Sequence, residues 1–124
     1  MIDNKVYQNI FNEIERFLPA DWSQMIAYFE YGEASYSFEF YVKINEQFIK
    51  CYALPNIIEE ELYSSFDAID KIIAPTRSDN GDWTNMTMVV DSNGNMHTDF
   101  DYTDLTEGAY QYMKDWKAKY LQQI

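Results

Sequence analysis

The sequence predicts an α+β fold in which a single antiparallel sheet of about five strands is covered by helices mainly on one face. Apolar residues recur at helical spacing in three segments, and five other segments have the short, aromatic or alternating character of strands. The connections between consecutive strands are too short for parallel pairing. The expected order is α-β-β-β-α-β-β-α, and 124 residues suffice for one domain, residues 1–124, but not for two.

The first expected helix covers about residues 4–18. Its apolar side chains recur every three to four positions, Asp3 or Asn4 can cap its start, and Pro19 follows its end. This spacing gives an apolar stripe that can pack on a sheet. The stripe consists of Val6, Ile10, Ile14 and Phe17.

Three strands are expected next. Residues 23–31 are largely apolar, and residues 35–44 alternate between apolar and polar side chains with a period of two, which is typical of a half-buried strand. Gly32-Glu33 and Asn45-Glu46 are short turns, and residues 47–54 form the returning strand. Turns this short make the neighbours antiparallel, so the three strands form a meander.

A second helix follows Pro55-Asn56. The helical period runs from Ile58 to Ile73, and three glutamates in its first turn suit the helix dipole. We expect Pro75 to close this helix, because proline interrupts helical hydrogen bonding. The polar residues 76–82 then form a loop.

The last third of the chain predicts a hairpin and a helix. Residues 83–90 and 95–102 flank the turn residues 91–94 and have the pattern of a β-hairpin. From about Leu105 the chain can be helical to its end.

The charge of the chain is strongly negative. Twenty-one acids and nine bases give −12, which argues against DNA, RNA or an anionic membrane as a partner because their phosphates would be repelled. Between Ser78 and Met113 there is no Lys or Arg. Acidity for solubility alone is one interpretation, but such surfaces usually mix both signs. The asymmetry therefore favours a one-signed acidic face for a basic protein partner.

The compartment is indicated by cysteine usage and by the N-terminal residues. Cys51 is the single cysteine, so an internal disulfide is excluded and a reducing compartment is expected. The first ten residues lack the features of a signal peptide, and no stretch approaches the ~20 apolar residues that cross a bilayer. We expect a cytoplasmic location.

Catalysis by histidine or cysteine has little support. His97 is the only histidine, so a histidine-based metal cluster is excluded. A nucleophilic pair of Cys51 and His97 stays open, but a buried structural cysteine is the favoured interpretation. No glycine-rich phosphate loop is present, and no cofactor is expected.

The densest group of carboxylates lies in residues 99–107. A divalent-metal site, an acid–base pair of the glycosidase type and a solvated or partner-facing strand face all fit acids at these spacings. We favour the strand face, with His97, Asp99 and Asp101 on one side and Asp104 capping the last helix three residues before Glu107. We therefore expect neither a metal site nor catalytic residues.

Three motifs, taken in order, resemble one known family. They are Leu18-Pro19-Ala20-Asp21-Trp22 after the first helix, Asp82-Trp83-Thr84 followed by Gly94 and residues 100–107 (FDYTDLTE), and Trp116-Lys117-Ala118-Lys119-Tyr120-Leu121 near the end. Together they span nearly the whole chain. In these motifs the chain resembles the YezG/EsaG-like immunity proteins, antitoxins that protect bacteria from their own secreted polymorphic toxins.

The resemblance implies a protein without enzymatic turnover that binds a cognate toxin, commonly a nuclease domain, until the toxin is exported or when a sibling cell delivers it. A nuclease surface attracts phosphates and is typically basic, which agrees with the acidic charge. The expected mechanism is stoichiometric occlusion or distortion of the toxin. The candidate contacts, taken from the base-free stretch, are Asp82, Asp91, Asp99, Asp101, Asp104 and Glu107.

Four aromatic residues, Trp22, Trp83, Tyr102 and Trp116, match family positions, and we expect them to pack in the interior rather than to contact the partner. Two alternative functions stay open. One is a generic acidic protein-interaction adaptor, and the other is a metal-dependent hydrolase that uses the carboxylates of residues 99–107. The oligomeric state does not follow from the sequence.

Overall fold

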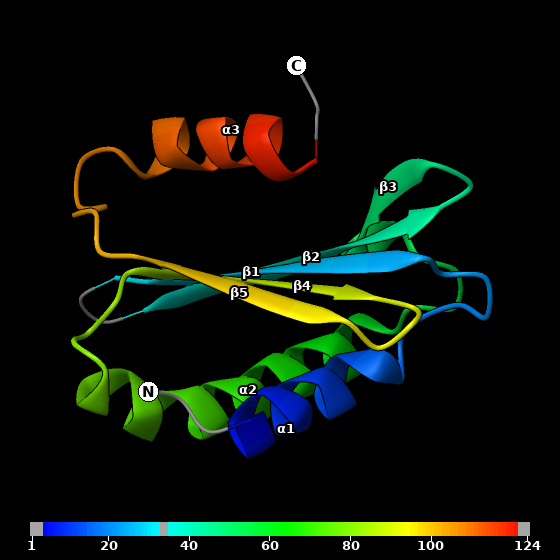
Figure 1. Cartoon of the computed structure of the whole chain (residues 1–124), viewed down its shortest axis with the longest axis horizontal. Helices are drawn as coiled ribbons and strands as arrows, with labels where there is room; N and C mark the ends of the chain where they lie inside the picture. The colour runs from blue at the N-terminus through cyan, green and yellow to red at the C-terminus, as the bar shows by residue number, and fades with distance from the viewer. Residues whose placement is uncertain (1–3, 33–34, 122–124) are drawn as a thin grey trace.

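The computed structural model describes residues 4–32 and 35–121, which form one five-stranded antiparallel sheet and three α-helices (Figure 1). The strand order is β3-β2-β1-β4-β5. The α+β class and the predicted element order are confirmed. Asp3 of the predicted helix cap, Glu33 of the predicted turn and residues 122–124 of the predicted last helix lie outside the described residues. The elements are α1 (Asn4–Glu15), β1 (Gln24–Tyr31), β2 (Tyr36–Ile44), β3 (Gln47–Lys50), the 3₁₀ helix η1 (Cys51–Ala53), α2 (Glu59–Asp79), β4 (Asn85–Asp91), β5 (Met96–Asp101) and α3 (Ala109–Tyr120).

Strand β1 lies at the centre of the sheet because both of its faces are apolar. Tyr28 and Phe29 point to opposite faces, as consecutive strand residues do, and both are fully buried. The Phe29 ring meets Phe38 edge-on at 5.0 Å between centroids, and the Tyr28 ring meets Trp116 edge-on at 4.9 Å on the other face. The apolar run of β1 therefore serves two separate cores.

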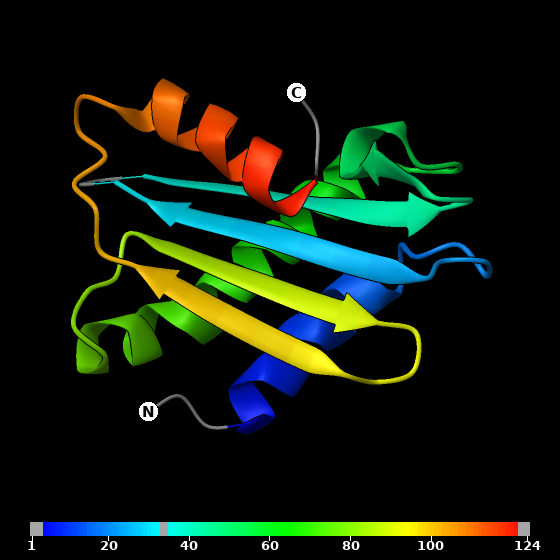
Figure 2. The same ribbon diagram turned by 45° about the horizontal axis from the view of Figure 1, so that its top comes forward.

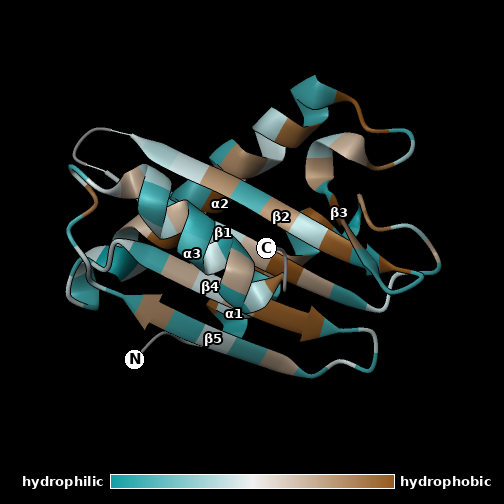
Figure 3. Cartoon of the chain, turned by 90° about the horizontal axis from the view of Figure 1, so that it is seen from above, coloured by the Kyte–Doolittle hydropathy of each residue, from teal (hydrophilic) through white to brown (hydrophobic). Residues whose placement is uncertain are grey.

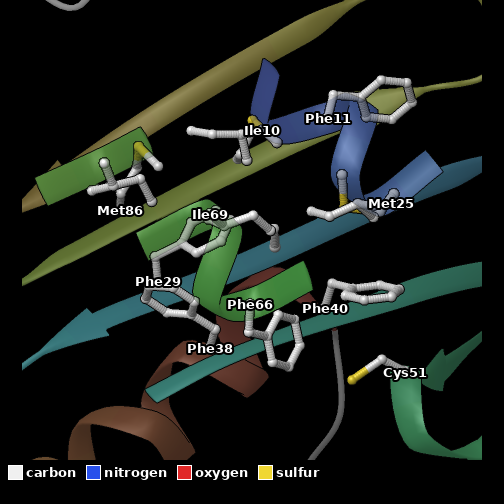
Figure 4. Packing of buried hydrophobic residues seen from close by; sticks show 14 of the residues in the cluster. Ile10, Phe11, Met25, Phe29, Phe38, Phe40, Cys51, Phe66, Ile69 and Met86 are labelled. Carbon is white, nitrogen blue, oxygen red and sulfur yellow. The ribbon is translucent and has the colours of Figure 1, made fainter. Parts of the chain in front are cut away.

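Helices cover the two faces of the sheet unequally. α1 and α2 pack side by side on one face, and α3 crosses the other (Figures 1 and 2). The larger core lies between the sheet and α1 and α2, where Ile10 and Ile69 face strand residues such as Phe38 (Figure 4). The smaller cluster joins Tyr28 to Trp116 under α3. The prediction of helices mainly on one face is thus confirmed for two of the three helices that the described residues form.

Helix α2 is longer than predicted, and Pro75 lies inside it rather than at its end. A proline in a helix interior removes one backbone hydrogen bond. The Thr76 hydroxyl donates to carbonyls of the preceding turn, and the Arg77 Nε–H donates to the Trp83 carbonyl at 2.5 Å, which anchors the last turn. The predicted loop over residues 76–82 is therefore wrong in its first half. No helix in the described ranges combines the length and the apolar character needed to cross a membrane.

The returning strand is shorter than predicted. β3 pairs only with residues 41–44 of β2, after which the chain turns into η1. Cys51, at the start of η1, and Leu54, after it, are both buried in the larger core (Figure 4 shows Cys51). Their burial directs the chain out of the sheet, so the predicted strand 47–54 is wrong after Lys50.

The predicted helix ends differ in two places. After α1 ends at Glu15, the N–H groups of Phe17 and Leu18 bond to carbonyls three residues earlier, so the last predicted residues form a tighter turn. Helix α3 begins at Ala109 rather than near Leu105, because residues 106–108 form turns.

Candidate partner-binding site

Two of the predicted contact acids, Asp99 and Asp101, lie on the face of β5 that looks towards α3. They alternate with residues of the other face, and His97 precedes them on the same side. The His97 ring also lies 2.8 Å from the Asp99 carboxylate. The prediction that the three residues share one polar face is therefore confirmed.

A groove of about 280 Å³ lies between this face of β5 and α3. The Tyr112 hydroxyl donates to Asp101 Oδ2 at 3.0 Å, and the Tyr120 hydroxyl donates to Asp99 Oδ2 at 2.6 Å. Each strand acid is thus paired with a tyrosine of the helix. The groove is lined by Asn85, Thr87, Asp99, Phe100, Asp101, Tyr112, Asp115, Trp116, Lys119 and Tyr120.

Helix α3 presents these tyrosines because its aromatic residues recur every four positions. Tyr112, Trp116 and Tyr120 share one face of the helix. The Trp116 Nε1–H donates to Thr87 Oγ1 in β4 at 2.8 Å, and the indole is buried against Tyr28. The tryptophan fixes the helix on the sheet, and the tyrosines on either side of it reach the carboxylates of β5.

Hydrogen bonds keep both groove acids ionised. The Tyr120 hydroxyl makes the largest contribution to lowering the pKa of Asp99 below its usual value. The pKa of Asp101 is lowered first by the Thr103 hydroxyl and also by the hydroxyl of Tyr112. Partial burial acts in the opposite direction in both cases but is outweighed. Both groups are therefore charged carboxylates at neutral pH.

Pairing of an acid with a tyrosine recurs throughout the described residues. A tyrosine hydroxyl is neutral at physiological pH, and burial beside Asp99 raises the pKa of Tyr120 to about 12. Such a hydroxyl satisfies a carboxylate as an acceptor and leaves its charge intact, whereas a lysine or arginine would compensate that charge. The pairs are Tyr28–Glu30, Tyr31–Asp70, Tyr36–Asp67, Tyr41–Glu39, Tyr112–Asp101 and Tyr120–Asp99. Of these acids, Glu39 is also paired with a base, Lys50 Nζ, at 3.3 Å.

Asp91 lies at the other end of the β4–β5 hairpin, away from the start of α3 (Figure 1). Its Oδ1 accepts the backbone N–H groups of Asn93 at 2.9 Å and Asn95 at 3.0 Å, and its Oδ2 accepts the Asn95 side-chain amide at 2.9 Å. These bonds lower the pKa of Asp91. Its carboxylate holds the hairpin turn together, and the structure does not bring it to the groove.

The other three predicted acids lie in loops at the end of the sheet where β4 begins and β5 ends. Asp82 Oδ1 is 4.0 Å from Arg77 Nη1, so its charge is partly compensated. Asp104 Oδ1 accepts the N–H of Thr106 at 2.9 Å, and the predicted cap of the last helix is wrong because α3 begins later. Glu107 is exposed in the same loop.

The structure also shows where the residues of the two catalytic alternatives lie, the cysteine–histidine pair and the metal site. Cys51 is buried beside β2, and burial raises the pKa of its thiol, whereas His97 is exposed on β5 at the opposite edge of the sheet. The cysteine–histidine pair that the sequence left open is therefore not formed. Within residues 4–32 and 35–121, no three His, Cys, Asp or Glu side chains are grouped so that they could hold a metal ion.

The four aromatic residues of the family motifs differ in exposure. Trp83 and Trp116 are buried, as predicted. Trp22 is partly buried and packs near the Phe11 ring at 6.1 Å. Tyr102 is 58% exposed, so the prediction of interior packing is wrong for it, although its hydroxyl donates to the Asn80 carbonyl at 3.2 Å.

Sequence reasoning missed the helical side of the groove. Tyr112, Asp115 and Tyr120 line it, but none of them was among the predicted contacts. The four-residue spacing of the aromatic residues around Trp116 was the available signal. It was ambiguous because the same spacing is expected of a helix that packs on the larger core.

Comparisons with known proteins agree with the motif-based resemblance. The family model described as "Immunity protein YezG-like" matches residues 4–124. The immunity protein YezG of Bacillus spizizenii (strain ATCC 23059 / NRRL B-14472 / W23) is 27% identical over 112 residues, which cover 81% of this chain and 68% of that protein. The immunity protein YezG of Bacillus subtilis (strain 168) is 23% identical over 129 residues, covering 94% and 85%. The chain therefore belongs to the YezG-like immunity protein family, whose members act as antitoxins towards a cognate toxin.

Proposed function

We propose that this immunity protein neutralises a secreted polymorphic toxin with a basic nuclease domain by binding it stoichiometrically in the cytoplasm and covering the surface that the nucleic acid needs. The observation that carries the proposal is the pair of ionised acids, Asp99 and Asp101, whose hydrogen-bond donors across the groove are neutral tyrosines. No turnover is required, because the complex itself blocks the toxin.

The charge distribution supports a nuclease as the partner. A nuclease must attract phosphate groups, so its active surface is positive, and an acidic inhibitor is steered towards such a surface and pairs with it. The groove acids keep their charge, and Asp104 and Glu107 add exposed carboxylates in the loop that leads to α3. Lys119 also lines the groove, but Asp99, Asp101 and Asp115 outnumber it there, so the groove is net negative.

Exposed aromatic residues near the same loops supply the apolar part of the contact. Tyr102, directly after β5, is 58% exposed, and Tyr110, in the first turn of α3, is 81% exposed. Tyrosines are enriched at the centres of protein interfaces, where the ring is buried and the hydroxyl finds a partner. Acids and exposed tyrosines together form the surface that we assign to the toxin.

The assignment is tested with the C-terminal domain of the toxin encoded beside this chain. The double variant Asp99→Asn/Asp101→Asn removes two charges but keeps side chains that can accept the tyrosine hydrogen bonds. Its association rate with the toxin domain at low salt is expected to fall at least tenfold and to depend less on salt. The control is Glu15→Gln, an exposed acid in the last turn of α1 on the opposite face of the sheet.

Cell survival tests the function itself. Co-expression of the wild-type chain is expected to rescue cells that produce the toxin domain, and the two proteins are expected to co-purify in a one-to-one complex. Absence of both rescue and complex would refute the proposed function. A complex whose association rate is the same for the double variant and for the wild type would remove Asp99 and Asp101 from the contact.

A further inference from the structure

The first half of β2 forms an open edge of the sheet. β3 pairs with residues 41–44 of β2, the Cys51 thiol of η1 lies against the Phe40 backbone, and no strand in the described part of the chain borders residues 36–39 on that side. Figure 3 shows this outer side of β2 beyond the end of β3. Open strand edges present backbone donors and acceptors to which another chain can pair.

The hydrogen-bond pattern identifies the residue whose backbone faces outwards. The Tyr31 N–H donates at 2.9 Å to the carbonyl of Thr84, the residue before β4, and consecutive residues of a central strand bond alternately to their two neighbours. Glu30 therefore faces β2, where its partner is Ser37. It follows that the N–H and C=O groups of Phe38 point away from β1, to the open edge.

A pocket of about 390 Å³ lies against this edge on the face covered by α2. Its apolar part is made by the buried rings of Phe38 and Phe66. Tyr52 and Tyr63 are 39% and 50% exposed, and their rings lie 6.3 Å apart. Aromatic side chains are therefore offered to solvent beside an unpaired strand.

The pocket is also negatively charged. The Tyr36 hydroxyl donates to Asp67 Oδ1, and burial together with this bond raises the pKa of Tyr36 to about 12, so the acid is paired with a neutral group. The lining itself contains no lysine or arginine; the nearby Lys50 Nζ lies 5.8 Å from the centroid of the Tyr52 ring and is paired with Glu39 at 3.3 Å rather than with Asp67. A cation beside a carboxylate and against tyrosine rings is stabilised by both charge attraction and cation–π contact.

We propose that the outer edge of β2 receives an extended segment of the toxin, which adds as a strand beside residues 36–39 and places a lysine or arginine in the pocket next to Asp67. Paired residues of neighbouring strands point to the same face, so the basic residue is the one opposite Phe38. The backbone bonds supply affinity, and the pocket supplies selectivity. The inference rests on the proposed function, but it adds a second contact on the opposite edge of the sheet from the groove.

The experiment compares amide hydrogen exchange of the full chain, free and in complex with the C-terminal domain of the toxin encoded beside it. The amides of Tyr36 and Phe38 are expected to exchange at least tenfold more slowly in the complex.

Asp67→Lys is expected to weaken binding of the toxin domain at least tenfold. Glu15→Lys, the same charge change on α1, is expected to alter binding less than twofold. Tyr63→Ala, which removes a half-exposed ring, is a second variant that leaves the buried core in place.

The outcomes separate the two proposals. The β2 contact is overturned if the β2 amides exchange as fast in the complex as in the free chain and the toxin domain binds Asp67→Lys as tightly as wild type. The proposed function would then still stand. Failure to form any complex overturns the proposed function, and the β2 contact with it. Slowed exchange together with the loss caused by Asp67→Lys supports the second contact.

Discussion

The indole N–H of Trp116 donates a hydrogen bond to the hydroxyl oxygen of Thr87 at 2.8 Å, and this bond joins the last helix to the sheet. The Thr87 hydroxyl in turn donates to the Asn85 side-chain oxygen at 3.1 Å. All three side chains are buried, so water cannot replace either bond at low cost. The position of α3, and with it the width of the groove, depends on this short chain of hydrogen bonds.

Thr87→Val is expected to lower the free energy of unfolding by about 1–3 kcal/mol, because the buried Trp116 N–H loses its acceptor. The shape of the side chain is nearly unchanged. Urea denaturation followed by tryptophan fluorescence measures the effect. Thr98→Val makes the same chemical change on the edge strand β5 and is expected to cost less than half as much. Equal losses for the two variants would show that the Trp116 bond contributes nothing.

Pro75→Ala is expected to stabilise the protein by about 1 kcal/mol. Pro75 is exposed in the interior of α2, so the change removes no buried contact, and alanine restores the missing helical N–H. The greater freedom of alanine in the unfolded chain offsets part of this gain. Thermal unfolding measures the difference, with Ala74→Gly, one residue away in the helix, expected to destabilise by a similar amount. A lower melting temperature for Pro75→Ala would show that the helix relies on the proline.

Local pattern explains which elements were predictable. The alternation in residues 35–44 places β2 within one residue of its observed start, because a period of two is set by side chains alternating across a sheet. The Asn45-Glu46 turn is also confirmed, with both residues at positive φ. The end of α2 was mispredicted because the contact of Arg77 with Trp83 outweighs the local effect of Pro75.

The candidate site was only half predictable for a related reason. The alternation of β5 places Asp99 and Asp101 on one face, which is a local property. Their donors, Tyr120 and Tyr112, come from α3, and the bond from Tyr120 to Asp99 spans 21 residues. Amphipathic spacing shows that a helix packs on something, but it does not show which face of a sheet the helix covers.

The thiol of Cys51 is expected to be unreactive in the folded protein. It is fully buried, and burial raises its pKa, so the reactive thiolate is scarce near neutral pH. The reaction with Ellman's reagent should be slow in buffer and complete within minutes in 6 M guanidinium chloride, a condition of about the strength that unfolds most domains. Rapid reaction of the folded chain would contradict the buried position.

Tyr120→Phe is expected to raise the pKa of the Asp99 carboxyl, because it removes the hydrogen bond that contributes most to lowering it. A carboxyl whose folded pKa lies below its unfolded value stabilises the protein above the unfolded pKa, about 3.9 for aspartate. That stabilisation is lost as the pH falls through the folded pKa. The stability difference between wild type and Tyr120→Phe should therefore be largest near neutral pH and shrink below about pH 4.

Tyr120→Phe also tests whether the hydroxyl of Tyr120 keeps Asp99 charged or whether the tyrosine contributes only by packing. Carbon-13 titration of the Asp99 carboxyl measures the pKa directly, and Tyr110→Phe, at a ring that is 81% exposed, is the matched control. At neutral pH the Asp99 charge remains in Tyr120→Phe, so toxin association should keep its salt dependence even though the protein is less stable. If the pKa of Asp99 is the same in wild type and Tyr120→Phe, the hydroxyl does not hold the acid in its charged form, and the aromatic stripe of α3 acts through packing alone.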